Sequence, residues 1–208
     1  MAVAKGPACK QCRRERVKLF LKGQRCFSDK CVLEKKPYAP GQRAKRRLME
    51  TDYCVQLREK QKAKRYYGVW ERQFKNYYKK AVKRKGVTGE ILLQLLETRL
   101  DNIVYVMGFA ASRVQARQLI NHGHIQVNGR KVDKPSYQLK EGQEISVAES
   151  SKEIIPIMEA KESGGSLTMP EWLEVDLDNL KGKLLRYPER DEIRVPANEQ
   201  IIVELYSK

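Results

Sequence analysis

The sequence predicts an α+β fold, because two hydrophobic patterns occupy different parts of the chain. Bulky apolar residues recur at helical spacing up to about His122, whereas Ile125 to Val127 and Glu144 to Val147 alternate as strands do. Four cysteines near the start add a third observation, since metal-ligand spacing is typical of a small element that lacks an apolar core. We therefore expect a zinc-stabilised N-terminal element, a helical domain, and further helices with a small antiparallel sheet.

The charge of the chain is concentrated in its first half. The 208 residues carry a formal net charge of +16 and are 41% hydrophobic, which is sufficient for buried cores. Residues 1 to 100 hold 28 Lys plus Arg against 9 Asp plus Glu, whereas the remainder holds 14 against 17. Such an excess predicts a polyanionic partner rather than a merely solvated surface. With no apolar run of about 20 residues and no signal-peptide core, we expect no membrane partner and a cytoplasmic location.

The first element, residues 1 to 44, has a C-x2-C-x13-C-x4-C pattern. Two close pairs of thiolates separated by a loop can converge tetrahedrally on one structural zinc ion, and four thiolates leave no position for a substrate. The alternatives are an iron–sulfur cluster, free thiols and disulfide-paired thiols, and of these the disulfide is disfavoured in a reducing compartment. The predicted ligands are Cys9, Cys12, Cys26 and Cys31.

Helices are expected over much of residues 44 to 122. Helix-forming, highly charged sequence runs from Ala44 to Gly68, and bulky residues recur at helical spacing from Trp70 to Lys85 before Gly86. Further helices carry apolar stripes at residues 91 to 96 and, after a break near Arg99, at 103 to 107. Ser112 with Gln115 fits a capping box that starts a last helix ending near His122, with Gly123 in the left-handed conformation.

Short strands and turns follow that helix. Ile125 to Val127 and a return strand from Lys131 flank Asn128-Gly129, the strongest short signal for a hairpin. A third strand is expected at 144 to 147, a polar linker at 162 to 166, and a final strand at 200 to 206.

The helix after Ser112 and the hairpin together suggest RNA binding. Arg113 and Arg117 lie four residues apart and are expected to form a basic stripe beside an N-terminal cap, where phosphates can be held. The hairpin tip at 128 to 131 is polar and basic, and could lie beside that stripe. The tyrosines at 66, 67, 77 and 78 could stack on bases, but we expect at least half of them to be packing residues.

Several stretches of the sequence resemble a known family. Glu97 to Asn102, Gly108 to Arg113, Ala116 to Ile120, His122 to Ile125 and Val127 to Gly129 resemble the S-four RNA-binding domain. Outside that domain, the chain resembles the bacterial small-subunit ribosomal protein four family in five segments, at residues 9 to 12, 17 to 23, 37 to 42, 57 to 62 and 198 to 200. Two departures are Val106, where an arginine is common, and Arg43-Ala44, where His-Gly is common. They leave one phosphate contact and one loop contact uncertain.

The resemblance implies a two-domain organisation with an inserted S-four domain. Its parts are a zinc-binding element at 1–44, helices of the first domain at 45–96, the S-four domain at 97–160, and a tail at 161–208 packing back on the first domain. It also implies a structural, non-catalytic constituent of the small ribosomal subunit that binds ribosomal RNA early in assembly and influences decoding accuracy. The implied partners are small-subunit ribosomal RNA, neighbouring ribosomal proteins and messenger RNA near its entry channel, with no small-molecule substrate. Some members of the family repress their own messenger.

The candidate RNA contacts are basic or polar side chains of the N-terminal element, the helical region, and the helix and hairpin after Ser112. They are Arg13, Arg14, Lys22, Arg43, Arg46, Arg47, Arg58, Lys62, Arg65, Lys83, Lys85, Arg99, Ser112, Arg113, Arg117, Gln118, His122, His124, Asn128, Arg130 and Lys131.

Two other functions remain open from the sequence. Pseudouridine synthases often carry an S-four domain and use an Arg-Leu-Asp motif, which Arg99 to Asp101 imitates. Here Asp101 is explained as a short polar residue at a helix start, the chain lacks room for a catalytic domain, and the histidines lack a paired nucleophile. The second alternative is a non-ribosomal RNA-binding regulator using the same surfaces. A DNA reader is disfavoured, because no recognition helix or dimer element is evident.

Overall fold

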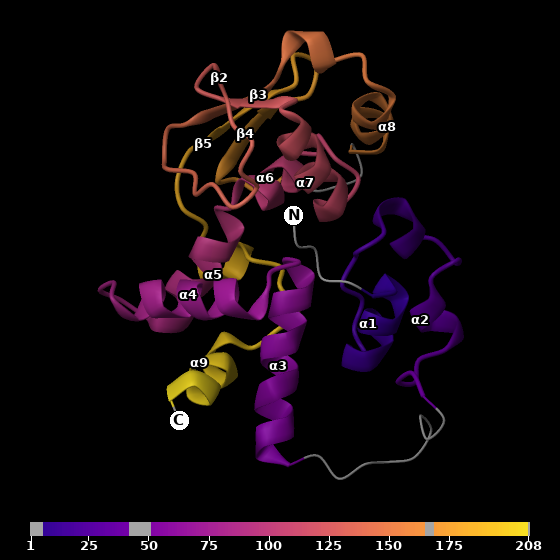
Figure 1. Cartoon of the computed structure of the whole chain (residues 1–208), viewed down its shortest axis with the longest axis vertical. Helices are drawn as coiled ribbons and strands as arrows, with labels where there is room; N and C mark the ends of the chain where they lie inside the picture. Colours follow the sequence, from indigo (N-terminus) through magenta and orange to yellow (C-terminus); the bar gives the residue numbers. More distant parts are fainter. Residues whose placement is uncertain (1–5, 42–50, 165–168, 208) are drawn as a thin grey trace. The chain divides into compact units, whose positions relative to one another are not determined.

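The computed structural model describes residues 6–41, 51–164 and 169–207, and within them the α+β class is confirmed (Figure 1). The chain divides into two compact units. Unit 1 contains residues 1–93 and 194–208, and unit 2 contains residues 94–193. Among the described helices, none is long and apolar enough to cross a membrane.

Unit 1 is helical in its described part. Its helices are α1 (Ala8–Glu15), the 3-10 turn η1 (Gly23–Cys26), α2 (Val32–Lys35), α3 (Asp52–Tyr66), α4 (Glu71–Val82), the greater part of α5 (Thr88–Glu97), and α9 (Glu199–Ser207). Helix α3 begins at Asp52, because Thr51 caps it by accepting a hydrogen bond from the Cys54 amide. The expected start near Ala44 lies outside the described residues.

Helices α3 and α9 lie side by side in unit 1 (Figure 1), and Phe74 of α4 stacks on Tyr206 of α9. Tyr66, Tyr67 and Tyr77 are buried, so the prediction that at least half of the four tyrosines are packing residues is confirmed. Tyr78 stacks on Tyr206 of α9 with ring centroids 4.7 Å apart.

The predicted strand at 200 to 206 is wrong, because these residues form α9. The β-branched run at 201 to 203 favours a strand in isolation. Two contacts outweigh that preference: the Asn198 carboxamide oxygen accepts from the Gln200 amide at 2.9 Å, and Ile202 is fully buried.

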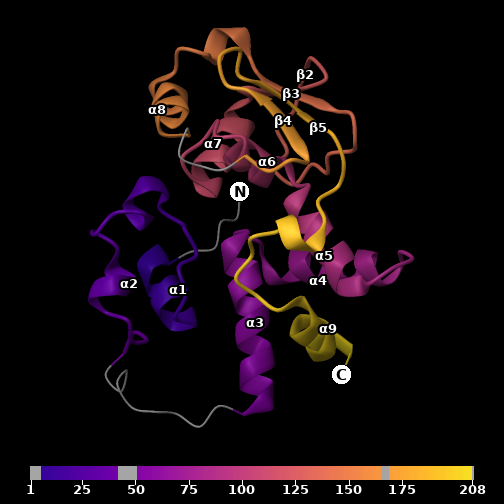
Figure 2. The ribbon, with the colours of Figure 1, turned by 180° about the vertical axis from the view of Figure 1, so that it is seen from behind.

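Unit 2 packs helices on one side of an antiparallel sheet (Figure 2). Its elements are the end of α5, then α6 (Leu100–Val106), α7 (Arg113–His122), β1 (Ile125–Val127), β2 (Arg130–Lys131), β3 (Glu144–Val147), η2 (Glu149–Ser151), α8 (Ile155–Gly164), β4 (Leu173–Asp176), β5 (Lys181–Leu184) and η3 (Arg190–Glu192). The sheet order is β2-β1-β3-β5-β4. The core joins apolar residues of α6 and α7 to inward-facing residues of the strands.

The sheet extends unit 2 beyond the expected end of the S-four domain at 160. Strands β4 and β5 were not anticipated, and β5 pairs with β3 through Glu144↔Lys183 and Ile145↔Gly182. Of the expected tail, the described residues 161–164 and 169–193 therefore belong to unit 2, and 194–207 belong to unit 1. The expected polar linker at 162 to 166 also differs, since α8 continues to Gly164 and residues 165–168 lie outside the described part.

Candidate nucleic-acid interface

The polar helix and hairpin predicted from the sequence are present in unit 2. Ser112 caps α7, its Oγ accepting from the Gln115 amide at 3.3 Å, and Gly123 ends the helix at φ 79°. The capping box itself is not formed as expected. The Gln115 side chain instead accepts from the Ala111 amide at 2.6 Å, one residue before the cap.

The hairpin connects β1 to β2 by a two-residue turn. Asn128 and Gly129 both have positive φ, at 49° and 74°, which matches the twist that a tight hairpin needs. The Asn128 carboxamide oxygen accepts from the Glu144 amide at 2.9 Å, so this side chain ties the turn to β3. We therefore assign Asn128 and Ser112, both predicted RNA contacts, a structural part in holding the helix and the hairpin.

An exposed polar surface runs from the end of α7 to the hairpin, and we call its four side chains the helix–hairpin surface: Gln118, His122, His124 and Lys131. Gln118 and His122 are exposed one helical turn apart, and the His122 and His124 ring centroids are 6.0 Å apart. The Lys131 side chain lies over Gly123, where an added Cβ would come within 1.8 Å of its Cε. Lys131 is thus held at the end of the helix, which the sequence spacing only suggested.

The surroundings of His124 favour the neutral form of its imidazole. Burial lowers the pKa of His124, and the nearby His122 and Lys131 lower it further. Its Nδ1 lies 2.9 Å from the Ser151 hydroxyl oxygen. At neutral pH the surface therefore presents the neutral His124 imidazole beside the Lys131 ammonium, a combination suited to phosphate and base edges.

The expected basic stripe of Arg113 and Arg117 is not exposed, because both side chains are buried. Both residues are 7% exposed, and Arg99 is 2% exposed. Arg117 donates to the Asp101 carboxylate through Nε at 3.0 Å and Nη2 at 2.5 Å. These guanidinium groups can be buried because α6 supplies acceptors for their hydrogen bonds.

Asp101 is the centre of this buried network. Arg99 binds it as well, with Nε donating to Oδ1 at 3.0 Å and Nη2 to Oδ2 at 2.7 Å. The sequence assigned Asp101 only a helix-start role, and no local signal reveals a partner 16 positions away. Since both guanidinium groups serve this carboxylate, we assign Arg99 and Arg117 to positioning α6 and α7 rather than to direct phosphate contact.

Arg113 belongs to a second buried chain of contacts. Its Nε donates to the Asn102 carboxamide oxygen at 2.8 Å, and Asn102 donates in turn to the Glu97 backbone oxygen at 2.9 Å. The Arg113 guanidinium also lies 4.6 Å from the centroid of the Tyr105 ring. These contacts fix the start of α7 against α6.

In unit 1, several predicted RNA contacts also serve internal contacts. Arg58 and Arg65 of α3 both form ion pairs with Glu15 of α1, whose side chain has no exposed surface. Burial raises the pKa of Glu15, whereas Arg58 and Arg65 act to lower it. Arg13 donates to the Tyr38 backbone oxygen at 3.0 Å, and Lys62 pairs with Glu59.

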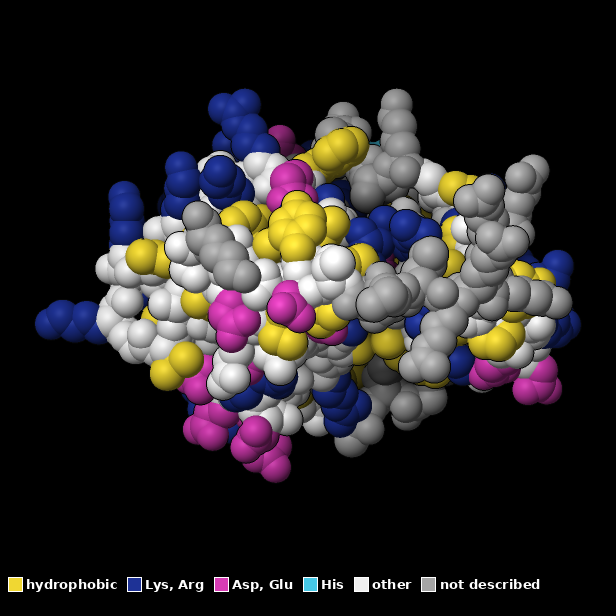
Figure 3. Space-filling model, turned by 90° about the horizontal axis from the view of Figure 1, so that it is seen from below, with side chains coloured by type: hydrophobic (Ala, Val, Ile, Leu, Met, Phe, Trp, Pro, Cys, Tyr) yellow, Lys and Arg dark blue, Asp and Glu magenta, His cyan; other side chains and the backbone are white. Residues whose placement is uncertain are grey.

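The remaining predicted contacts are either exposed or outside the described residues. Arg14, Lys22, Lys83, Lys85 and Arg130 are exposed and available to a partner. Arg43, Arg46 and Arg47 lie outside the described residues. In the space-filling view, Lys and Arg side chains project from several places on the visible face (Figure 3).

The four predicted metal ligands belong to the N-terminal element: Cys9 and Cys12 lie in α1, Cys26 ends η1, and Cys31 precedes α2. Burial raises the pKa of the Cys12 thiol, and Cys26, Cys9 and Cys31 each add to the shift through their charge. The Lys22 amide donates to Cys26 Sγ at 3.3 Å. Across the described ranges, no three His, Cys, Asp or Glu side chains stand in a metal-binding arrangement. Cys54 is partly buried in α3, as expected for an isolated cysteine.

Comparison with known proteins gives matches along most of the chain. The family model described as "Ribosomal protein S4/S9 N-terminal domain" matches residues 4–97, and the "S4 domain" model matches residues 98–145. The chain is 56% identical to the small ribosomal subunit protein uS4 of Natranaerobius thermophilus, and this match covers 100% of both chains. It is 57% identical to the uS4 protein of Koribacter versatilis, again over 100% of both, and 53% identical to that of Thermus thermophilus over 98% of both.

Proposed function

Because the chain belongs to the ribosomal protein S4 family, we propose that it is a structural, non-catalytic component of the small ribosomal subunit that binds ribosomal RNA. The observation that carries this proposal is the identity above 50% with uS4 proteins along the whole chain. The geometry of unit 2 agrees with it. A rigid buried network supports an exposed polar surface, and that arrangement suits RNA held by shape and phosphate contacts. The protein then acts in the ribosome, in the cytoplasm.

The same proposal includes partners and consequences that the family resemblance suggests. We propose that the chain binds early during assembly at a junction of RNA helices, contacts neighbouring ribosomal proteins, and lies near the entry channel for messenger RNA. An influence on decoding accuracy and repression of its own messenger belong to the same proposal. The exposed basic residues of unit 1 support the RNA contacts by their charge.

The RNA contact is tested at Lys131. Replacing Lys131 by Gln removes a charge held beside α7, so the slope of log affinity against log salt should fall by about 0.7 to 0.9 for one lost phosphate contact. The matched control is Lys183→Gln, which removes an exposed lysine from β5 of the same sheet. Equal slopes for both variants and the unaltered chain would remove Lys131 from the RNA interface.

We further propose that Cys9, Cys12, Cys26 and Cys31 hold one structural zinc ion, with an iron–sulfur cluster as the alternative. Two features support this proposal: the C-x2-C-x13-C-x4-C spacing of the four cysteines, and the hydrogen bond from the Lys22 amide to Cys26 Sγ, which stabilises a thiolate. Bound zinc would supply cross-links to an element whose core is small.

Metal content and protease resistance test the zinc proposal together. Cys9→Ser with Cys12→Ser should abolish stoichiometric zinc and make the first ~40 residues sensitive to protease. Cys54→Ser, outside the cluster, should change neither. Resistance that is identical with and without a chelator would refute a structural metal, and visible absorption with bound iron would favour the cluster.

A further inference from the structure

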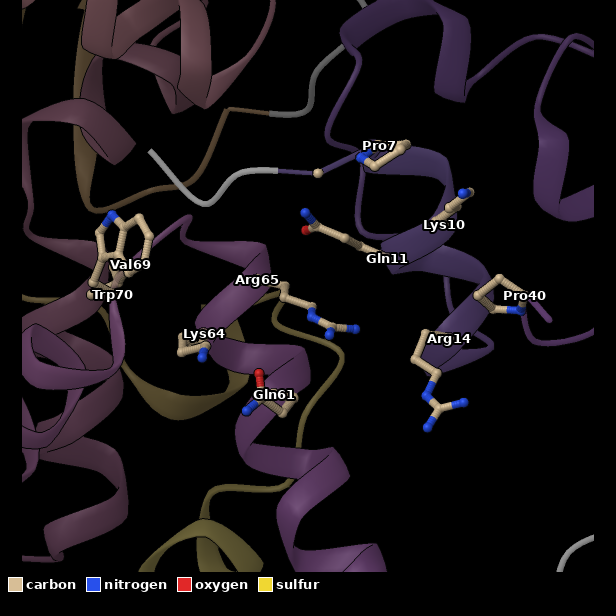
Figure 4. A pocket seen from close by; sticks show the side chains of 11 residues that line it. Pro7, Lys10, Gln11, Arg14, Pro40, Gln61, Lys64, Arg65, Val69 and Trp70 are labelled. Carbon is tan, nitrogen blue, oxygen red and sulfur yellow. The ribbon is translucent and has the colours of Figure 1, made fainter. Parts of the chain in front are cut away.

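A cavity of about 420 Å³ lies between α1 and α3 within unit 1, and we call it the α1–α3 cavity (Figure 4). Its volume is within the range of ordinary ligand sites, about 300–1,000 Å³. It is separate from the helix–hairpin surface, which belongs to unit 2. The lining residues are Gly6, Pro7, Lys10, Gln11, Arg14, Pro40, Gln61, Lys64, Arg65, Val69 and Trp70.

The lining is strongly basic. Lys10 and Arg14 come from α1, whereas Lys64 and Arg65 come from α3, so positive charge enters from both sides. None of the described lining residues is acidic. Converging cations with no carboxylate among them favour an anionic ligand, such as a phosphate group.

Two of these cations are paired with carboxylates that do not line the cavity. Arg65 is paired with buried Glu15, and Lys64 Nζ lies 3.0 Å from Glu71 Oε2. Glu71 is also bound by Lys60, which is itself buried. Side chains fixed in this way lose less conformational freedom when a ligand binds, and this favours binding.

The cavity also has an aromatic wall and neutral hydrogen-bonding groups. Trp70 is 43% exposed although it is one of the largest apolar side chains of the chain. Pro7, Pro40 and Val69 complete the apolar part of the lining, and the carboxamides of Gln11 and Gln61 supply donors and acceptors. An indole face beside amides and cations is the combination with which proteins hold an unstacked RNA base.

We propose that the α1–α3 cavity binds one unstacked nucleotide of structured RNA, with the base stacked on Trp70 and the phosphate held by Lys10, Arg14 and Arg65. This inference rests on the proposed function, because it names a place where the ribosomal RNA enters the protein. Sequence reasoning did not identify Trp70, since an aromatic residue beside a helix start resembles a core residue until its exposure is known.

Tryptophan fluorescence tests the stacking directly. The chain contains two tryptophans, and Trp172 is buried in unit 2 with no hydrogen-bond partner for Nε1 among the described atoms. Trp172→Phe therefore removes no hydrogen bond of the indole N–H described in the structure and leaves Trp70 as the only tryptophan. Naked small-subunit ribosomal RNA should quench this emission. The reciprocal variant, Trp70→Phe, reports Trp172 alone and should show little quenching.

Affinity for the same RNA tests the energetic contribution. Trp70→Ala should weaken binding about 5- to 150-fold, the range that corresponds to loss of one stacked base, and Trp70→Phe should retain most of the affinity. Lys10→Gln with Arg14→Gln should flatten the salt slope more than Lys75→Gln with Lys79→Gln, an exposed pair of equal charge on α4. Circular dichroism checks that each variant folds.

The outcomes separate this inference from the proposed function. If ribosomal RNA binds Trp70→Ala as tightly as the unaltered chain and leaves the Trp70 emission unchanged, the nucleotide site is refuted while the ribosomal role stands. If the unaltered chain shows no preference for ribosomal RNA over an unrelated structured RNA, the proposed function fails. Quenching together with the selective loss of affinity supports both.

Discussion

Replacing Asp101 by Asn should destabilise unit 2 more than any surface change of the same chemistry. The Asp101 side chain is 2% exposed and neutralises both Arg99 and Arg117, whose Nη2 atoms lie 2.7 and 2.5 Å from Oδ2. Asn keeps one oxygen acceptor but removes the negative charge that Asp101 supplies to these two buried guanidinium groups. Breaking a buried ion pair costs about 3–5 kcal/mol, and the retained acceptor places the expected loss near 3 kcal/mol.

Urea unfolding followed by Trp172 fluorescence measures this loss in unit 2. The experiment uses a Trp70→Phe background, so that the signal comes from Trp172 alone. In thermal unfolding of a unit of about 100 residues, the same loss of free energy should lower Tm by roughly 12–24 °C. Asp178→Asn is the matched control, because Asp178 is 93% exposed and should shift the free energy of unfolding by no more than about 0.5 kcal/mol. A shift below about 1 kcal/mol for Asp101→Asn would refute the central role of this carboxylate.

Three further changes test other parts of the structure. Burial alone would raise the pKa of Glu71, but hydrogen bonds from Lys60, Lys64 and Tyr206 lower it from 4.5 to about 2. A lowered carboxylate pKa stabilises the fold above about pH 4.5 and loses that effect as the pH falls toward 2, so Glu71→Gln should cost stability at about pH 6 and little at about pH 2. The full pKa shift of Glu71 corresponds to about 3 kcal/mol of stability, and solvent screening at a side chain that is 46% exposed reduces this to about 1 kcal/mol. Equal urea midpoints for Glu71→Gln and the unaltered chain at about pH 6 would contradict this contribution. Gly123→Ala should lower the free energy of unfolding by about 1–2 kcal/mol, because φ is +79° at this residue, and should weaken RNA binding by displacing Lys131. An unchanged unfolding midpoint would count against this strain. His122→Ala should weaken RNA binding in a filter assay, whereas Val114→Ala, at an exposed position on the same helix, should not; equal affinities would remove His122 from the interface.

Local signals predicted much of unit 2. Ser112, Gly123 and Asn128-Gly129 each fix a cap or a turn through their own backbone and side-chain chemistry, and the structure has the corresponding helix and hairpin where expected. Strand β5 was not anticipated. Its residues Lys181 to Leu184 form a short, half-charged segment that becomes a strand because β3 and β4 supply partners on both sides.

The candidate site was predicted less completely than the fold. Residue type and spacing identified Arg113 and Arg117 as cations on one helix face, but their exposure depends on acceptors in α6. The same limit applies to the tail, where Ile201 to Val203 favour a strand until burial of Ile202 and the cap at Asn198 are known. Sequence patterns therefore located the basic elements, whereas long-range partners decided which cations face outward.

The central claim is that this chain binds ribosomal RNA at a defined site and does not merely attract polyanions by its charge. A salt titration of binding to naked small-subunit ribosomal RNA, against an equal mass of an unrelated structured RNA, tests it most directly. We expect the ribosomal RNA to stay bound at salt concentrations that release the competitor. Loss of both RNAs at the same salt concentration would contradict the claim and leave only general basic charge.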